Sequence, residues 1–419
     1  MEKNVLVLAA GESSRFFPFS EKAHKSEFIL GGKPIIEHML DILSSYKNTN
    51  VVVVVRENGR LSSLTKKYPR VKIAVQREAK GMHDAIMSAK HLLKGEFLVI
   101  LPYHLEIALR LNVVFKAKTP SILVKTYAEG DELTKGIASV ENGKITKLIE
   151  KAKFQGGNCS VLGVYKLDQE FMERCSVYPN SDEYTFEKIL AQYADSGRLN
   201  AIIENKTVHS LKYAHDLLTL KEEIYDVLLK ANKKHKKKIK LGKNSIIEKT
   251  VIVSDGVKIG NNTTVKGRSF LGKNSFIGDN CLIRDSFMES DSEVGFGTEV
   301  ARSIIGKSSH IHSGYLGDSI IGVRVRIGAN FITANKRIDR NNVRVTIKNE
   351  NVDSKLNGLG CIIGDDVHTG INVSTMPGTI VGQRCIIGAD TQIKGTIESD
   401  NLVYEKRENI VKLAQEVKK

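Results

Sequence analysis

The sequence lacks the features of a membrane-spanning, exported or zinc-binding chain. Its apolar runs, such as Val51–Val55, are far too short to cross a bilayer, and the N-terminus lacks a basic segment followed by an apolar core of signal length. Its few cysteines lie far apart, without the close pairs that hold metal ions, and suit reduced thiols packed as small hydrophobic residues. We therefore expect a cytoplasmic protein with no membrane association, whose five cysteines are Cys159, Cys175, Cys281, Cys361 and Cys385.

The chain also lacks aromatic residues within its most basic segment. Seven lysines fall between Lys230 and Lys240 and carry part of the net charge of +15. A nucleic-acid surface, which is one interpretation of this run, would need aromatic rings among the lysines as stacking platforms. We therefore expect a solvated linker over residues 230–240 and no nucleic-acid partner. The overall positive charge would also favour phosphorylated substrates.

The second half of the chain has a strict period of six residues. This spacing fits neither an α-helix nor a pleated strand, but it fits one flat side of a β-helical coil with one small apolar residue per side pointing inward. The register breaks near Glu289 and across residues 335–360, and it returns after each break. The sequence therefore predicts an all-β, left-handed parallel β-helix of hexapeptide repeats over residues 241–400. Its first eight inward positions are Leu241, Ile247, Val253, Ile259, Val265, Leu271, Ile277 and Ile283.

The first half of the chain alternates buried strands with helical segments. Residues 4–10 have the pattern of a strand that leads into a loop at Gly11, and residues 34–43 follow with helical periodicity. This alternation predicts an α/β domain over residues 1–229 with a parallel, doubly wound sheet, whose ligands bind beyond the carboxyl ends of the strands. Further strands are expected at residues 51–55, 72–75 and 97–101.

The loop after the first strand has the composition of a phosphate site. Gly11 would let backbone N–H groups approach a phosphate, while Arg15 and Lys25 would neutralise the remaining charge of a triphosphate. The same residues are also explained by a glycine in a turn followed by two solvated basic side chains, and this alternative stays open.

Read together with the residues that follow, this segment resembles the signature of sugar-1-phosphate nucleotidylyltransferases. Leu8–Gly11, Arg15, Lys25 and Gly32–His38 stand at the positions of that signature. The resemblance implies a Rossmann-like nucleotidyltransferase domain, an NTP and a sugar-1-phosphate as substrates, and catalytic roles for Arg15 and Lys25. It also implies a nucleotide-binding set and a sugar-binding set, which are Gly11, Gln76 and Gly81, and Glu150 and Lys151.

The same resemblance implies Mg²⁺ held by two carboxylates, because in-line attack of a sugar phosphate on the α-phosphorus builds up negative charge. Tyr103 and Ser210 occupy the two carboxylate positions here, and a phenol is a poor Mg²⁺ ligand. His104, Glu106 and Asp216 are nearby candidates for replacement ligands. Two interpretations follow: a working nucleotidylyltransferase, or a catalytically lapsed paralogue that binds nucleotide or nucleotide sugar and acts as a regulatory, oligomerising subunit.

The solenoid carries a second resemblance in Ile311–Ser319. This segment resembles the bifunctional glucosamine-1-phosphate acetyltransferase/UDP-N-acetylglucosamine pyrophosphorylases, especially the archaeal type. It implies acetyl-CoA as co-substrate, an amino-sugar phosphate as acceptor and a homotrimer. It also implies that His312 is the catalytic base and that Tyr315 and Asn335 contact the sugar. The alternative is that His312 is one of several polar residues on an exposed coil edge.

The inserted loop and the C-terminal tail have weaker patterns. Lys355–Gly358 stands where archaeal members carry a basic cluster, and Arg326, Arg337 and Arg344 would compensate for its loss. Residues 401–419 have apolar residues at helical spacing and predict an amphipathic helical tail. A purely structural β-helix scaffold is a third interpretation of the chain, but it leaves the residues of the phosphate loop unexplained.

Overall fold

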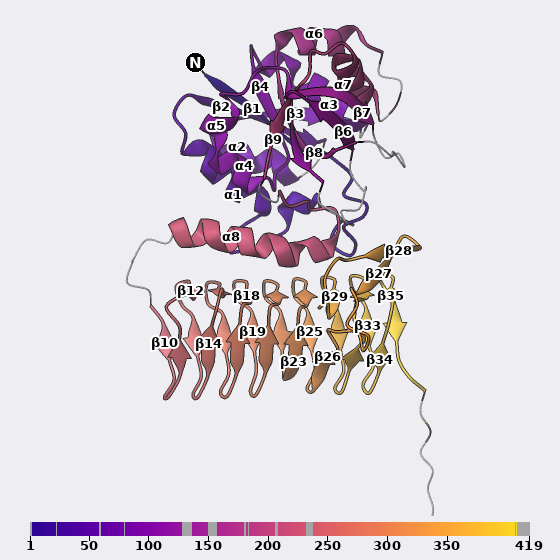
Figure 1. The fold of residues 1–419 in the computed structure, drawn as a ribbon. Helices are drawn as coiled ribbons and strands as arrows, with labels where there is room; N and C mark the ends of the chain where they lie inside the picture. Colours follow the sequence, from indigo (N-terminus) through magenta and orange to yellow (C-terminus); the bar gives the residue numbers. More distant parts are fainter. Residues whose placement is uncertain are drawn as a thin grey trace, which may run out of the picture. The chain divides into compact units, whose positions relative to one another are not determined.

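The computed structural model describes residues 2–21, 23–57, 60–78, 80–127, 136–149, 157–179, 182, 184–205, 208–231, 238–406 and 408. The chain divides into two units (Figure 1). The head domain comprises residues 1–16 and 20–227, and the solenoid unit comprises residues 17–19 and 228–419. Most of the expected linker, residues 232–237, lies outside the described residues.

The head domain is built on one mixed nine-stranded sheet. Its first four strands pair in parallel, as the sequence predicts, but β8 runs antiparallel to its three partners, β4, β5 and β6. Val5, Leu6 and Val7 of β1 are fully buried because helices cover both faces of a doubly wound sheet. In sheet order the strands are β3 (Val71–Gln76), β2 (Thr49–Arg56), β1 (Lys3–Ala9), β4 (Phe97–Ile100), β8 (Cys159–Leu167), β5 (Ser121–Thr126), β9 (Asn200–Ile203), β7 (Lys144–Ile149) and β6 (Ile137–Glu141).

Helices connect these strands. Pro34, with φ −54°, directly precedes α1, which suits a residue whose ring already fixes a helical φ. No helix within the described ranges is both long and apolar enough to span a bilayer. The α-helices are α1 (Ile35–Ser44), α2 (Leu64–Lys67), α3 (Gly81–Ser88), α4 (Leu105–Leu109), α5 (Leu111–Val114), α6 (Gln169–Val177), α7 (Thr185–Asp195) and α8 (Leu217–Ala231). Short 3₁₀-helices are η1 (Lys25–Glu27), η2 (Arg60–Ser63), η3 (Lys90–Leu92) and η4 (Ala214–Asp216).

The second half of the chain is a left-handed parallel β-helix, as predicted (Figure 1). Each coil gives one short strand to each of three parallel sheets. Sheet one contains β10 (Lys240–Leu241), β13 (Lys258–Ile259), β16 (Phe276–Ile277), β19 (Glu293–Val294), β22 (His310–Ile311), β25 (Arg326–Ile327), β30 (His368–Thr369), β33 (Ile386–Ile387) and β36 (Leu402–Val403). Sheet two contains β11 (Ile246–Ile247), β14 (Thr264–Lys266), β17 (Leu282–Arg284), β20 (Glu299–Ala301), β23 (Gly314–Gly317), β26 (Phe331–Thr333), β31 (Ser374–Thr375) and β34 (Gln392–Ile393). Sheet three contains β12 (Ile252–Val253), β15 (Phe270–Leu271), β18 (Phe287–Met288), β21 (Ile304–Ile305), β24 (Ile320–Ile321), β29 (Cys361–Ile363), β32 (Thr379–Val381) and β35 (Thr396–Ile397).

The inward positions of the coils form the core of the solenoid. Ile277 and Ile283 are fully buried, whereas Leu241 is 52% exposed because it belongs to the first coil and has no coil beneath it. At the break near Glu289, Met288 takes the inward position and is fully buried, so the coil continues with one residue fewer. Residues at the corners adopt positive φ, which asparagine tolerates better than most residues: examples are Asn262, Asn274 and Asn280.

Two segments depart from plain coils. The insertion at residues 335–360 forms an antiparallel hairpin of β27 (Arg344–Ile347) and β28 (Glu350–Asp353). At the C-terminal end, β36 pairs with β33, so the solenoid extends into the range for which the sequence predicts a helical tail. Residues 409–419, which carry the predicted helical pattern, lie outside the described residues.

Candidate functional site

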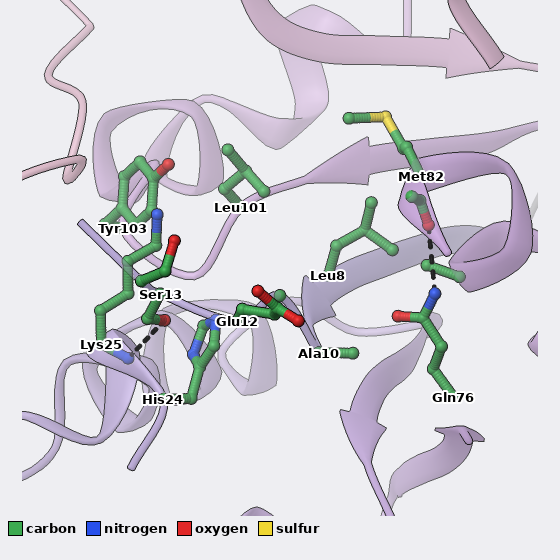
Figure 2. A pocket seen from close by; sticks show the side chains of 14 residues that line it. Leu8, Ala10, Glu12, Ser13, His24, Lys25, Gln76, Met82, Leu101 and Tyr103 are labelled. Carbon is green, nitrogen blue, oxygen red and sulfur yellow. Dashed lines mark hydrogen bonds between the residues drawn. The ribbon is translucent and has the colours of Figure 1, made fainter. Parts of the chain in front are cut away.

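A pocket of about 380 Å³ lies at the carboxyl end of β1 in the head domain (Figure 2). This is the edge of a doubly wound sheet at which ligands bind. Five structural features contribute to it: the loop after β1, η1, the start of α3, the end of β3 and the end of β4. Its lining residues are Leu8, Ala10, Gly11, Glu12, Ser13, Ser14, His24, Lys25, Gln76, Gly81, Met82, Ala85, Leu101 and Tyr103.

The loop after β1 leaves room for a ligand at Gly11. A Cβ atom placed on Gly11 would meet no atom within 4 Å, so this backbone borders open pocket space. Ser13 adopts φ +57°, and its Oγ atom accepts a hydrogen bond from the backbone N–H of Lys25 (3.1 Å). This bond ties the loop to η1. Arg15 is exposed and does not line the pocket, in contrast to Gly11 and Lys25.

Lys25 brings a positive charge into the pocket. Its Nζ atom lies 5.0 Å from the ring centroid of Tyr103, which is cation–π distance. Burial lowers the pKa of Lys25 from its ordinary value to about 8, the charges of Arg15 and Lys212 act in the same direction, and Asp216 opposes them. Lys25 is therefore mainly an ammonium group at neutral pH, and it is suited to pair with a phosphate.

Gln76 and Gly81 are brought into direct contact. The Nε2 atom of Gln76 donates hydrogen bonds to the carbonyl oxygen of Gly81 (3.1 Å) and to Oδ2 of Asp84 (3.0 Å). The carbonyl oxygen and the carboxylate can only accept hydrogen bonds, so the NH₂ group of the Gln76 amide must point toward them. No described residue donates to Oε1 of Gln76, which can therefore accept a hydrogen bond from the N–H edge of a base. Asp84 does not line the pocket but positions Gln76, a role that the sequence did not indicate.

His24 also lines the pocket and was not predicted. The backbone N–H of Ser26 donates to its Nδ1 atom (3.2 Å), so the ring proton is assigned to Nε2. Burial lowers the pKa of His24 to about 3, with smaller contributions from Lys25 and Arg56, so the ring is neutral. The sequence feature that could have indicated His24 as a pocket residue is its position directly before Lys25.

The positions at which the resemblance implies metal carboxylates do not suit Mg²⁺. Tyr103 is 5% exposed, and burial, together with the nearby Asp216, raises its pKa, so it remains a neutral phenol. Ser210 is exposed and does not line the pocket. Among the described residues, no group of three or more His, Cys, Asp or Glu side chains is placed to hold a metal ion.

The predicted replacement ligands have other partners. The Nδ1 atom of His104 accepts a hydrogen bond from the backbone N–H of Leu101 (3.3 Å). The Oδ2 atom of Asp216 accepts from the backbone N–H groups of Lys212 (2.6 Å) and Tyr213 (2.8 Å). Glu106 does not line the pocket. The predicted sugar-binding pair, Glu150 and Lys151, lies outside the described residues.

A second polar cluster lies on sheet two of the solenoid. Asp318 accepts two hydrogen bonds from Arg302, at 2.6 Å and 2.7 Å, and a third from Nδ2 of Asn335. A Cβ atom on Gly317 would lie 2.4 Å from the hydroxyl oxygen of Tyr315 and 2.9 Å from Nδ2 of Asn335. The two predicted sugar-binding residues of the solenoid therefore converge over Gly317. Arg302 and Asp318 complete the cluster and were not predicted as site residues.

His312 lies apart from this cluster within one chain. It is exposed in the turn between β22 and β23, where its backbone N–H donates to the carbonyl oxygen of Ile327 (3.0 Å). The cluster around Asp318 lies at the opposite end of β23. Two of the arginines expected to compensate for the changed insertion are held inside it, because Arg337 pairs with Asp339 and Arg344 donates to Asn351.

Comparisons with known proteins show what the chain is similar to. A nucleotidyl transferase family model matches residues 4–209. Bifunctional protein GlmU of Methanococcus maripaludis strain C7 is 32% identical, covering 97% of this chain and 98% of the relative. A bifunctional sugar-1-phosphate nucleotidylyltransferase/acetyltransferase of Sulfurisphaera tokodaii is 29% identical, over 90% of this chain and 93% of the relative. A solved structure of UDP-glucose pyrophosphorylase with UDP-glucose covers 54% of this chain and 99% of that chain, with 18% identity and a TM-score of 0.44. The chain belongs to the GlmU-like family of bifunctional sugar-1-phosphate nucleotidylyltransferase/acetyltransferases.

Proposed function

We propose that the head domain transfers a nucleotidyl group from an NTP to a sugar-1-phosphate, giving an NDP-sugar and diphosphate. The observation that carries this proposal is the pocket at the end of β1, where Gly11, Lys25 and Gln76 face one ligand-sized space. A backbone loop next to a lysine suits a triphosphate, and an amide acceptor suits a nucleobase. The roles of Glu150 and Lys151 toward the sugar stay part of the proposal.

In the proposed reaction, an oxygen of the sugar phosphate attacks the α-phosphorus in line with the leaving diphosphate. The new bond joins that oxygen to the α-phosphorus, and the bond to the bridging oxygen breaks with its electron pair moving to diphosphate. The Lys25 ammonium, with Arg15 beyond the pocket rim, would stabilise the negative charge that builds up on the phosphate oxygens. Gly11 would keep the loop close to the phosphates, and Gln76 would orient the base.

We propose further that the solenoid acetylates an amino-sugar phosphate with acetyl-CoA as co-substrate. The amine nitrogen attacks the thioester carbonyl, the C–N bond forms, and the C–S bond breaks with its electron pair moving to sulfur. His312 would take the amine proton and pass it to the thiolate. Tyr315 and Asn335, which converge over Gly317, would position the sugar.

The proposed assembly is a homotrimer formed through the solenoid. Support comes from apolar side chains that the single chain leaves exposed on this unit, including Phe296 (65%), Ile371 (51%) and Leu402 (62%). We also propose a cytoplasmic location. All five cysteines are buried and free of disulfides, which suits a reducing compartment.

The experiment is a pair of assays on the purified full-length chain. UTP or dTTP with a panel of sugar-1-phosphates is tested for diphosphate release, and acetyl-CoA with amino-sugar phosphates is tested for thiol release. Lys25→Met should abolish only the first activity, and His312→Ala should lower only the second, by about 100-fold or more. Each variant is therefore the control for the other, and an absence of product in both assays would reject the proposal.

A further inference from the structure

The end of β4 holds an aromatic ring and an ammonium group where the family resemblance implies a metal ion. Tyr103 is 5% exposed, and the Nζ atom of Lys25 lies 5.0 Å from the centroid of its ring. We infer that the head pocket binds a nucleoside triphosphate without Mg²⁺, and that the Lys25 ammonium supplies the positive charge at this position. The inference rests on the proposed nucleotide site of the head domain.

The position of Lys25 is fixed from two sides. Its backbone N–H donates to Oγ of Ser13 (3.1 Å), which ties the lysine to the loop that would hold the phosphates. Its ammonium group is attracted to the electron-rich face of Tyr103. Figure 2 shows the lysine side chain running beside Ser13 toward that ring. The charge is therefore a built-in part of the pocket rather than a mobile surface group.

A divalent ion beside Tyr103 would be poorly held. Mg²⁺ prefers carboxylate, phosphate and water oxygens, and a neutral phenol offers it little. The ion would also lie close to the Lys25 ammonium, and like charges repel strongly in a site that is partly shielded from water. The ring and the lysine together thus disfavour the ion at the position where the lysine can replace its charge.

The nearby carboxylates are not gathered into a metal site, because among the described residues no three His, Cys, Asp or Glu side chains are placed to hold one ion. Oδ2 of Asp84 accepts a hydrogen bond from Gln76, and Oδ2 of Asp216 accepts two backbone hydrogen bonds. Neither Asp84 nor Asp216 lines the pocket; among the described lining residues Glu12 is the one carboxylate, and it is exposed on the loop after β1. A single exposed carboxylate gives Mg²⁺ little beyond what the nucleotide phosphates already provide.

Isothermal titration of the full-length chain with UTP, in Mg²⁺ and in EDTA, tests the inference. We expect the two dissociation constants to agree within about threefold. A dissociation constant about tenfold or more weaker in EDTA would overturn the inference and leave the nucleotide site standing. No binding under either condition would overturn both the inference and the proposed nucleotide site, so the two failures are distinguishable.

Three variants sharpen the test. Tyr103→Asp installs a carboxylate at the metal position that lines the pocket, and Mg²⁺ should then tighten UTP binding by about tenfold. Tyr103→Phe is the matched control, because it keeps the ring beside Lys25, and its ratio of affinities in Mg²⁺ and EDTA should stay near one. If Tyr103→Asp does not fold, Glu12→Gln decides. A loss of affinity confined to the Mg²⁺ samples would show that Glu12 holds a metal and would overturn the inference, whereas an unchanged ratio supports it.

Discussion

At the scale of single residues, the head pocket depends on two glycines for different reasons. Gly81 opens α3 with φ +90°, a conformation that side chains of L-residues disfavour. Gly11 has no neighbour within 4 Å of a would-be Cβ, so its value lies in the space that it leaves open. Gly81 is therefore needed for its backbone conformation, whereas Gly11 is needed for the space that it leaves to the ligand.

This difference predicts opposite outcomes for two alanine variants. Gly11→Ala should change the free energy of unfolding by less than about 1 kcal/mol, because the new methyl group meets nothing in the free protein. It should weaken UTP binding about tenfold, because the methyl group enters the space of the phosphates. Gly81→Ala should instead destabilise the fold by about 1–2 kcal/mol. Chemical denaturation and UTP titration of both variants measure the contrast, and a destabilised Gly11→Ala would contradict it.

Asp84 is expected to set the choice of nucleobase through Gln76. Because Asp84 fixes Nε2 of Gln76, the amide presents Oε1, which accepts from the N3–H group of uracil but not from the unprotonated N3 of cytosine. The wild-type chain should therefore bind UTP at least about tenfold more tightly than CTP. In Asp84→Asn the new amide can donate to Gln76, so the carbonyl oxygen of Gly81 alone still fixes the orientation, and the preference should shrink about threefold. Glu78→Gln, an exposed change nearby, is the control that should keep the preference.

Lys25 predicts a pH dependence of nucleotide binding. Its pKa of about 8 lies below the ordinary value, chiefly through burial, so the ammonium is present below pH 8 and is lost as the pH rises through that value. UTP affinity should therefore fall between about pH 7 and about pH 9.5. The free energy of unfolding should rise over the same window, because the unfolded chain still holds the proton. Lys25→Arg keeps its charge throughout this pH range. If UTP affinity of the wild-type chain were as independent of pH as that of this variant, Lys25 would not be the group that controls binding.

At the scale of structural elements, the six-residue period predicted which side chains build the solenoid core. Ile277, Ile283 and Val294 point inward and are fully buried. These positions were predictable because one period of six residues corresponds to one side of a coil. The antiparallel β8 was not predictable, because strand direction depends on which distant strand it meets. The site of the solenoid was only partly predictable for a similar reason: Arg302 and Asn335 meet at Asp318 only after successive coils stack. The roles of the predicted site residues stay predictions.

Two arginine–aspartate pairs that join successive coils allow a structural role of such a pair to be distinguished from a role in the site. Arg302–Asp318 and Arg324–Asp366 have the same two-point geometry, at 2.6 Å and 2.7 Å, but only Asp318 also contacts Asn335. Asp318→Asn should raise the KM for the amino-sugar phosphate about tenfold or more, because Asn335 loses its charged acceptor. Asp366→Asn is the matched control and should leave the KM unchanged, since exposed pairs contribute little. Equal effects in the two variants would mean that the pair at Asp318 is only structural.

At the scale of the whole molecule, His312 lies on an edge that also exposes large apolar side chains. Phe296, His312 and Ile371 each occupy a turn between sheet one and sheet two, in different coils of the stack. Phe296 is 65% exposed and Ile371 is 51% exposed. Apolar side chains aligned along one edge fit the proposed homotrimer, in which another subunit would cover this surface. A partner at this edge would also cover His312, which is exposed in the single chain.

This arrangement predicts that assembly and acetyl transfer fail together. Ile371→Glu puts a charge on the edge without touching His312, so it should shift the chain from trimer toward monomer and lower acetyl transfer about tenfold or more. UTP binding by the head domain should not change. Val177→Glu, at a position that is 84% exposed on α6, is the matched control and should leave both mass and activity as they are. Sedimentation velocity and the thiol-release assay give the two readouts, and a monomeric Ile371→Glu variant with full acetyl transfer would show that His312 works within one chain.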